Sequence, residues 1–243
     1  MISVVKNTTS LIKMSSIVNP ILKHSNVIVI IGRRNSGKTD FSLLIAEECY
    51  SQAIEKGVSF RVATNISCQC DFIEYICDYQ TLKKWIRERG RKLYILDEAG
   101  IAINRRRPMG KLTIAIIEII QLIRKFKSSL IFIGQNPKVL DTAIFDPAIL
   151  DAIVKKLSWK NAIYRDLVRH RQKIITEIPG TTVRFDSRDV APFTMKPIIE
   201  LKDLTPEMQV RKLYKSGLSF HKIAKELGYG SPTQVIRVLR KSL

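Results

Sequence analysis

A glycine-rich loop between an apolar run and a helical segment is where the sequence first offers recognisable chemistry. The five residues 27–31 (Val-Ile-Val-Ile-Ile) are all β-branched, which is typical of a strand buried on both faces. The loop that follows consists of Gly32, Arg33, Arg34, Asn35, Ser36, Gly37, Lys38 and Thr39. A Gly-x4-Gly-Lys-Thr pattern between a strand and a helix is a Walker A loop, which binds nucleotide phosphates. Both flanks disfavour the alternative of a chance glycine-rich turn.

The residue types of this loop match the parts of a phosphate site. We expect Gly32 and Gly37 to adopt backbone angles that a side chain would forbid, so that successive N–H groups turn toward phosphate oxygens. A helix predicted from about residue 38 to residue 54 points the positive end of its dipole at the β-phosphate. Lys38 is expected to reach the β- and γ-phosphates, and the Thr39 hydroxyl is expected to ligate Mg²⁺. The predicted cofactors are therefore ATP and Mg²⁺.

A second motif follows the apolar run 93–96 (Leu-Tyr-Ile-Leu), where two carboxylates, Asp97 and Glu98, end a predicted strand. This pattern is a Walker B motif, in which Asp97 would hold the Mg²⁺ shell and Glu98 would act as general base toward the attacking water. Two solvated acids at a strand end are the alternative. An adjacent glutamate favours a hydrolase that carries its own base over a switch GTPase or a simple kinase.

A third polar residue, Gln135, ends the apolar run 130–134 (Leu-Ile-Phe-Ile-Gly). If that strand neighbours the loop strand, Gln135 lies beside the γ-phosphate, because ligands of open α/β sheets bind at the carboxyl ends of strands. Gln135 is our candidate sensor. The helix predicted over residues 111–126 has Ile and Leu on nearly every face, which predicts that it is well buried.

Charge and hydropathy limit the partners and the compartment. The chain has 41 Lys and Arg against 22 Asp and Glu, a formal net charge of +19, which favours nucleic acid as a partner. No apolar run reaches the roughly 18 residues of a membrane span, and the first 23 residues lack the pattern of a signal peptide. The expected location is cytoplasmic. Cys68, Cys70 and Cys77 could be three metal ligands, but no fourth follows at zinc spacing, which favours reduced thiols.

Two hairpins are predicted after the sensor strand, one from runs 153–157 and 162–168 and one from runs 173–178 and 182–185. Residues 155–188 contain nine Lys and Arg against three acids.

Three short helices are predicted at the end of the chain, over residues 205–216 and 219–227 and from residue 231 onward. Glycine turns between them and Ala224 at a close crossing match a helix-turn-helix. Residues 201–243 contain nine Lys and Arg against three acids, which favours DNA binding over a bundle that only docks on the first domain. The candidate contacts to bases and phosphates are Lys222, Lys225, Ser231, Thr233, Gln234, Arg237, Arg240 and Lys241.

Together these motifs resemble the P-loop ATPases of the additional-strand, catalytic-glutamate division, and more narrowly the FtsK/HerA-like translocases with the genome-packaging ATPases of archaeal viruses. The matching segments are 32–39, 93–100 and 131–137, within a resemblance that covers about residues 25–190. It implies a homo-oligomeric ring, such as a hexamer, that pulls double-stranded DNA through a pore. It also implies an arginine acting in the neighbouring subunit, for which the sequence offers Arg105, Arg106, Arg107 and Arg124.

The C-terminal helix-turn-helix resembles a resolvase- or regulator-type module, which is not a standard feature of packaging motors. It therefore raises the alternative of a replication initiator similar to the DnaA/AAA+ group. Against that group, the residues after Gln135 resemble basic strands and show no helical lid with a sensor arginine.

We therefore expect an α/β fold, a RecA-like P-loop three-layer sandwich with a mostly parallel central sheet, plus a small all-α domain. The expected parts are a lead-in (1–25), an ATPase domain (26–196), a linker (197–204) and a helix-turn-helix domain (205–243). The expected function is that of an ATP-hydrolysing viral or plasmid DNA translocase or genome-packaging motor, with an initiator or a nucleotide-switched regulator as alternatives. Its partners would be double-stranded DNA and a viral capsid or replication protein, in the host cytoplasm if the protein is viral.

Overall fold

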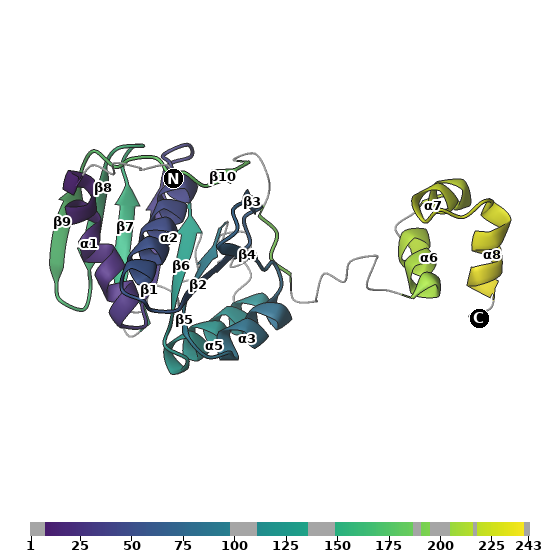
Figure 1. The fold of residues 1–243 in the computed structure, drawn as a ribbon, viewed down its shortest axis with the longest axis horizontal. Helices are drawn as coiled ribbons and strands as arrows, with labels where there is room; N and C mark the ends of the chain where they lie inside the picture. The colour runs from purple at the N-terminus through teal and green to yellow at the C-terminus, as the bar shows by residue number, and fades with distance from the viewer. Residues whose placement is uncertain are drawn as a thin grey trace. The chain divides into compact units, whose positions relative to one another are not determined.

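The computed structural model describes residues 8–97, 111–135, 149–186, 191–194, 205–215 and 218–240. The chain divides into two compact units, Met1–Pro197 and Ile198–Leu243, each with its own apolar core. Figure 1 shows both units, and each is described by itself below.

The first unit is built on an eight-stranded sheet in the order β4-β2-β5-β6-β1-β7-β8-β9. The six strands from β4 to β7 are parallel, and β8 and β9 continue the sheet in antiparallel pairing. The strands are β1 Val27–Gly32, β2 Phe60–Thr64, β4 Ile73–Tyr75, β5 Arg91–Leu96, β6 Ser128–Gly134, β7 Ala152–Lys156, β8 Ala162–Asp166 and β9 Arg171–Ile175.

Helices cover both faces of this sheet (Figure 1). Among the described residues these helices are α1 Thr8–Lys23, α2 Lys38–Glu55, α3 Tyr79–Arg87 and α5 Lys111–Lys125. Side chains alternate along β1: Ile28 and Ile30 join the apolar cluster of α1 and α2, whereas Val27 and Val29 join the cluster of α3 and α5. A strand buried on both faces needs apolar residues at successive positions, which is why β1 contains an unbroken β-branched run.

The strand order confirms the predicted α/β class and its RecA-like P-loop arrangement. Strand β6 lies between β1 and β5, with Ile131 paired to Ile28 on one side and to Ile95 on the other. The Walker A and Walker B strands are therefore separated by one additional strand, as the resemblance implied. Helix α5 is less buried than its sequence predicted, since Ile116 and Ile123 are buried but Ile114 is 52% exposed.

The N-terminal helix α1 is part of the core of this unit. Its residues Met14, Ile17, Val18 and Ile21 are buried in the same cluster as the apolar face of α2. All four cysteines of the chain are free thiols.

The outer strands agree with one predicted hairpin and contradict the other. Strands β7 and β8 form an antiparallel pair as expected. The second hairpin was wrong: β9 pairs with β8, and β10 (Arg184–Phe185) pairs with β3 (Cys68–Gln69). The physical reason is that the chain after β9 crosses α2. There Ile178 and Val183 are buried, and the carboxylate of Glu47 accepts hydrogen bonds from Thr181 and Thr182.

The described part of the second unit contains the three predicted helices, α6 Pro206–Lys215, α7 Phe220–Glu226 and α8 Pro232–Arg240. Its core is formed by Val210, Ile223, Ala224 and Val235. Between α7 and α8 the chain turns at Gly228, which has a φ of 70°, and the Tyr229 N–H donates to the Ala224 carbonyl at 2.8 Å. Within the described residues of both units, no helix has the length and apolar character needed to cross a membrane.

Candidate functional site

The Walker A loop connects the carboxyl end of β1 to the first turn of α2. Gly37 immediately precedes the helix with φ 76° and ψ 35°, a left-handed conformation that glycine adopts without strain. Gly32 differs from the prediction, because its φ lies outside the left-handed region. A Cβ at Gly32 would stand 2.7 Å from the Lys156 carbonyl oxygen and 2.8 Å from Ser36 Oγ. Close packing, rather than an unusual backbone angle, therefore requires glycine at position 32.

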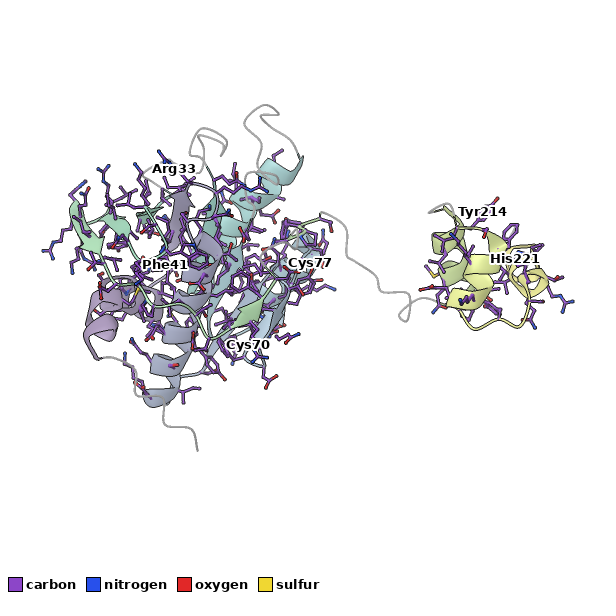
Figure 2. The ribbon with its side chains drawn as sticks, turned by 90° about the horizontal axis from the view of Figure 1, so that it is seen from above. Arg33, Phe41, Cys70, Cys77, Tyr214 and His221 are labelled. Carbon is purple, nitrogen blue, oxygen red and sulfur yellow. The ribbon has the colours of Figure 1, made fainter. Side chains whose placement is uncertain are left out.

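The side chains of the loop divide into exposed and buried groups. Arg33, Arg34 and Asn35 are exposed, and Figure 2 shows Arg33 at the margin of the unit. Ser36 is 5% exposed, and its Oγ has no hydrogen-bond partner among the described residues. A buried hydroxyl that lacks a protein partner fits a cradle whose partner is a phosphate oxygen.

Lys38 lies over this loop, where its Nζ donates to the Arg33 carbonyl at 2.8 Å. Burial lowers the pKa of Lys38, and the nearby Asp97 carboxylate partly offsets this effect. The ammonium group is thus held at the mouth of the loop, between the backbone that would receive phosphates and the carboxylate of the second motif.

The two predicted magnesium ligands are brought into direct contact. Thr39 Oγ1 donates to Asp97 Oδ2 at 2.7 Å, although 58 positions separate the two residues in the chain. Both groups lie at the carboxyl ends of the parallel strands. A hydroxyl and a carboxylate are the hard oxygen ligands that Mg²⁺ prefers. The residues present therefore fit a magnesium ion.

The position of Asp97 depends on Asn65, a residue that the sequence analysis did not single out. Asn65 is fully buried at the carboxyl end of β2. Its Oδ1 accepts from the Asp97 N–H at 2.8 Å, and its Nδ2 donates to the Asp97 carbonyl at 3.2 Å and to the Ala191 carbonyl at 3.1 Å. One amide thus ties the Walker B turn to β2 and to the segment 191–194. A buried amide needs such partners, but no local pattern marks the position.

Gln135 follows β6, whose Gly134 pairs with Ile31 of the loop strand. The condition set for a sensor, adjacency of its strand to β1, is thus met, and the Gln135 side chain is exposed. Its role in sensing the γ-phosphate stays a prediction. The predicted base Glu98 and the arginines Arg105, Arg106 and Arg107 lie outside the described residues.

Arg124 does not lie at the carboxyl ends of the parallel strands, where the Walker A loop and Asp97 are found. Its Nη2 donates to the Ile149 carbonyl at 2.7 Å and pairs with Asp151 Oδ1 at 3.6 Å. Asp151 accepts from the N–H of Val27 at the start of β1, so the pair lies at the opposite end of the parallel strands from the loop.

A lysine on β7 is a further neighbour of the loop that the sequence analysis included only in a basic region. Lys156 is the register partner of Gly32 and is 2% exposed. Its Nζ donates to the Trp159 carbonyl at 2.8 Å and stands 4.7 Å from the ring centre of Phe41. Phe41 is buried in the interior of the unit (Figure 2). Burial lowers the pKa of Lys156 to about 8, against the opposing effect of Asp40.

A cavity lined by charged residues lies at the end of β1 and β7 opposite to the Walker A loop. This cavity of about 300 Å³ between α1 and the outer strands is lined by the cationic or titratable side chains Lys23, His24, Arg169, Arg171 and Lys173. Its acid, Asp166, already accepts hydrogen bonds from the backbone and guanidinium of Arg169, at 2.9 and 3.1 Å. Lys23, Arg171 and Lys173 have no ion-pair partner among the described residues.

In the second unit, helix α8 presents three of the predicted base contacts, Thr233, Gln234 and Arg237, as exposed residues. Gln234 Oε1 accepts from the Gly230 N–H at 2.9 Å, which fixes the turn before the helix. Lys222 and Lys225 are exposed on α7, and Ser231 is half-buried. The side chain of Arg240 and the whole of Lys241 lie outside the described residues.

Comparison with known proteins gives a likeness of structure. No protein-family model and no curated protein sequence match the chain. The genome-packaging NTPase B204 of Sulfolobus turreted icosahedral virus 2, in complex with sulfate, is 16% identical with a TM-score of 0.49, over 64% of this chain and 98% of its own. The N-terminal domain of zonular occludens toxin from Neisseria meningitidis is 18% identical with a TM-score of 0.43, over 63% and 95%. The Orc1 protein of Aeropyrum pernix, in complex with DNA, is 17% identical with a TM-score of 0.44, over 61% and 44%. The chain is similar in structure to these proteins, and its function is argued from its own residues.

Proposed function

We propose that this protein hydrolyses ATP and uses the energy to move duplex DNA, as a genome-packaging or segregation motor of a virus or plasmid. The observation that carries the ATPase part is the 2.7 Å hydrogen bond between Thr39 and Asp97. It unites the Walker A and Walker B motifs at one sheet edge, where the left-handed Gly37 opens a helix N-terminus and Lys38 lies across the loop.

Each residue at the carboxyl ends of the parallel strands would have a separate role in phosphoryl transfer. The loop N–H groups, Ser36 and Lys38 would bind the phosphate oxygens, and Asn65 would keep Asp97 in place. A Mg²⁺ ion held by Thr39 and Asp97 would neutralise charge that develops on the phosphates.

The proposed base is Glu98, which follows Asp97 directly. As the water oxygen bonds to the γ-phosphorus, the bond from that phosphorus to the β–γ bridging oxygen breaks, and ADP leaves. The proton of the water passes to the Glu98 carboxylate. Gln135, one residue beyond the strand that neighbours β1, would report whether the γ-phosphate is present.

The DNA part of the proposal rests on charge and on the second unit. The net charge of +19 requires a polyanionic partner or abundant counterions. Exposed Thr233 and Arg237 lie one helical turn apart on α8, so both can face one groove. The cavity lined by Lys23, Arg171 and Lys173 gives the first unit its own group of cations suited to backbone phosphates.

Motor action is tested by displacement of a triplex-forming strand from linear duplex DNA in the presence of ATP. Displacement that depends on hydrolysis supports the motor. Hydrolysis that DNA stimulates without displacement would contradict translocation. It would favour the second candidate, an initiator or nucleotide-switched regulator, for which the helix-turn-helix arrangement of α6, α7 and α8 is the specific observation. Absence of ATP hydrolysis would overturn the motor, and absence of ATP binding would overturn both candidates.

The DNA surfaces are tested in the full chain by measuring affinity against salt concentration. Arg171→Glu is expected to weaken duplex binding and to reduce the slope of log K against log salt by about 0.9 for each phosphate that the protein no longer neutralises. Arg237→Ala is expected to weaken binding and to reduce discrimination between sequences. Lys84→Glu changes charge equally at an exposed position of α3, and serves as the control. An Arg171 variant no weaker than this control would contradict a role for the cavity.

A further inference from the structure

The turn between β7 and β8 lies against the Walker A loop and carries an exposed aromatic ring. A Cβ built on Gly37 would stand 2.9 Å from the nearest atom of the Trp159 ring, so the indole packs directly on the backbone of the loop. Even so, the Trp159 residue is 56% exposed, and Leu157 in the same turn is 49% exposed. Part of the indole thus contacts the phosphate loop while the rest faces solvent.

Several hydrogen bonds fix the turn in this position. The N–H groups of Leu157 and Ser158 donate to the Asn161 carbonyl at 3.0 and 3.2 Å, and the Ile178 N–H donates to the Lys160 carbonyl at 3.0 Å. The buried Lys156 Nζ donates to the carbonyl of Trp159 itself at 2.8 Å. The indole is therefore held in place by backbone bonds on both sides, and its exposure belongs to an ordered turn.

The sheet order determines which part of a nucleotide would reach this ring. The groups assigned to the γ-phosphate and its metal, Asp97 and Gln135, follow β5 and β6 on one side of β1. Strands β7 and β8 lie on the other side of β1. A triphosphate that occupies the loop with its γ-phosphate toward β5 and β6 must extend its nucleoside toward β7, where the turn 157–161 lies.

We propose that Trp159 is the nucleobase platform of this site, on which the base of a purine nucleoside triphosphate stacks. An indole offers a large flat π-face, and stacking of a base on an aromatic side chain tolerates different bases because each has such a face. The platform would select nucleotides over other polyphosphates. It would accept any base but bind purines more tightly, because their larger rings overlap more of the indole. This inference rests on the proposed nucleotide site, since it assigns the base end of the ligand whose phosphates the loop binds.

Calorimetric titration of the full chain with a non-hydrolysable ATP analogue and with inorganic tripolyphosphate separates the two ends of the ligand. Trp159→Ala is expected to weaken analogue binding about tenfold, the scale of one base–aromatic stack, and to leave tripolyphosphate binding unchanged. Trp159→Phe is expected to retain most of the affinity. The matched control is Tyr75→Ala, since Tyr75 is 52% exposed on the outermost parallel strand β4.

The outcomes that overturn the platform are distinct from those that overturn the site. Equal weakening of analogue and tripolyphosphate binding in Trp159→Ala would show that the indole only supports Gly37. Unchanged binding of both would show that the base does not touch it. If the unmodified chain bound neither ligand, the proposed function would fail together with the platform.

Tryptophan fluorescence gives an independent readout in the unmodified chain. The other tryptophan, Trp85, is 3% exposed on α3, so a ligand at the loop reaches only Trp159. Quenching by the ATP analogue and none by tripolyphosphate is expected. Equal quenching by both would contradict stacking of the base.

Discussion

In the proposed site, the two sides of the Walker A strand would hold a nucleotide by different means. On the side of β5 and β6, charged and hydroxyl groups converge, and the buried Asn65 fixes the turn that carries Asp97. On the side of β7, the contacts are a packed indole and a buried lysine whose ammonium group is bonded to the backbone of the same turn. The first side can stabilise charge that changes during reaction, whereas the second can only contribute binding that is equal before and after. Changes on the first side should therefore alter turnover, and changes on the second should alter affinity and stability.

The largest effect is expected from Glu98→Gln, which removes the proposed base and keeps the shape of the side chain. Hydrolysis should fall by about 10²- to 10⁴-fold, the usual contribution of a general base, while ATP binding stays intact. Single-turnover hydrolysis together with a binding titration measures both. Turnover equal to that of the unmodified protein would show that Glu98 is not the base. It would also contradict the expectation that the side of β5 and β6 controls turnover.

Lys38→Ala is expected to lower hydrolysis by about 10²- to 10³-fold, because a positioned cation at the β- and γ-phosphates acts most strongly in the transition state. The matched control is Lys56→Ala, an exposed lysine that follows the other end of α2. Steady-state ATPase rates compare the two variants. Similar rates in both would show that Lys38 does not reach the transferring phosphate.

Asn65→Ala tests whether the Walker B turn needs its buried amide. The substitution leaves the Asp97 N–H and carbonyl without their partner, which should lower the free energy of unfolding by about 1–3 kcal/mol. Because Asp97 is then no longer fixed in position, ATP hydrolysis should fall more than ATP binding. Urea unfolding and ATPase assays check the two parts separately. Reduced stability with unchanged hydrolysis would make Asn65 a structural residue only.

The part of this site that is local in sequence could be predicted, and the part that depends on pairing between strands could not. Residues 32–39 and Asp97 are recognisable because a phosphate loop and a strand-ending acid are continuous patterns. The strand β6 could be predicted from its apolar run, residues 130–134, whereas its place beside β1 was a condition that the pairing of the two strands meets. No local pattern marks Asn65, because its hydrogen bonds to Asp97 and Ala191 join residues 32 and 126 positions away.

Contacts between distant parts of the chain also account for the wrong second hairpin and for the absence of Trp159 from the candidates predicted from sequence. Pro179 and Gly180, which lie between the two runs of the predicted second hairpin, favour a turn. Burial of Ile178 and Val183 against α2 nevertheless directs the chain away from β9. Trp159 reaches Gly37 because β7 pairs with β1 in a register that places Lys156 opposite Gly32. A register between strands more than a hundred residues apart leaves no local pattern.

The smallest expected effect concerns Lys156, and it tests the β7 side through stability. Its pKa is about 8 in the folded protein and 10.5 in the unfolded chain, so between these values the unfolded state binds more protons. Stability should therefore rise as pH increases from about 8 toward 10, and be unaffected by this group below pH 8, where both states are protonated. With residual solvent screening, the gain should be about 1–2 kcal/mol. Lys156→Met should remove this rise, and urea unfolding at pH 7.5 and pH 9.5 measures the difference. If the variant retained the full rise, other groups would cause it, and the Lys156 ammonium group would be well solvated in the folded protein.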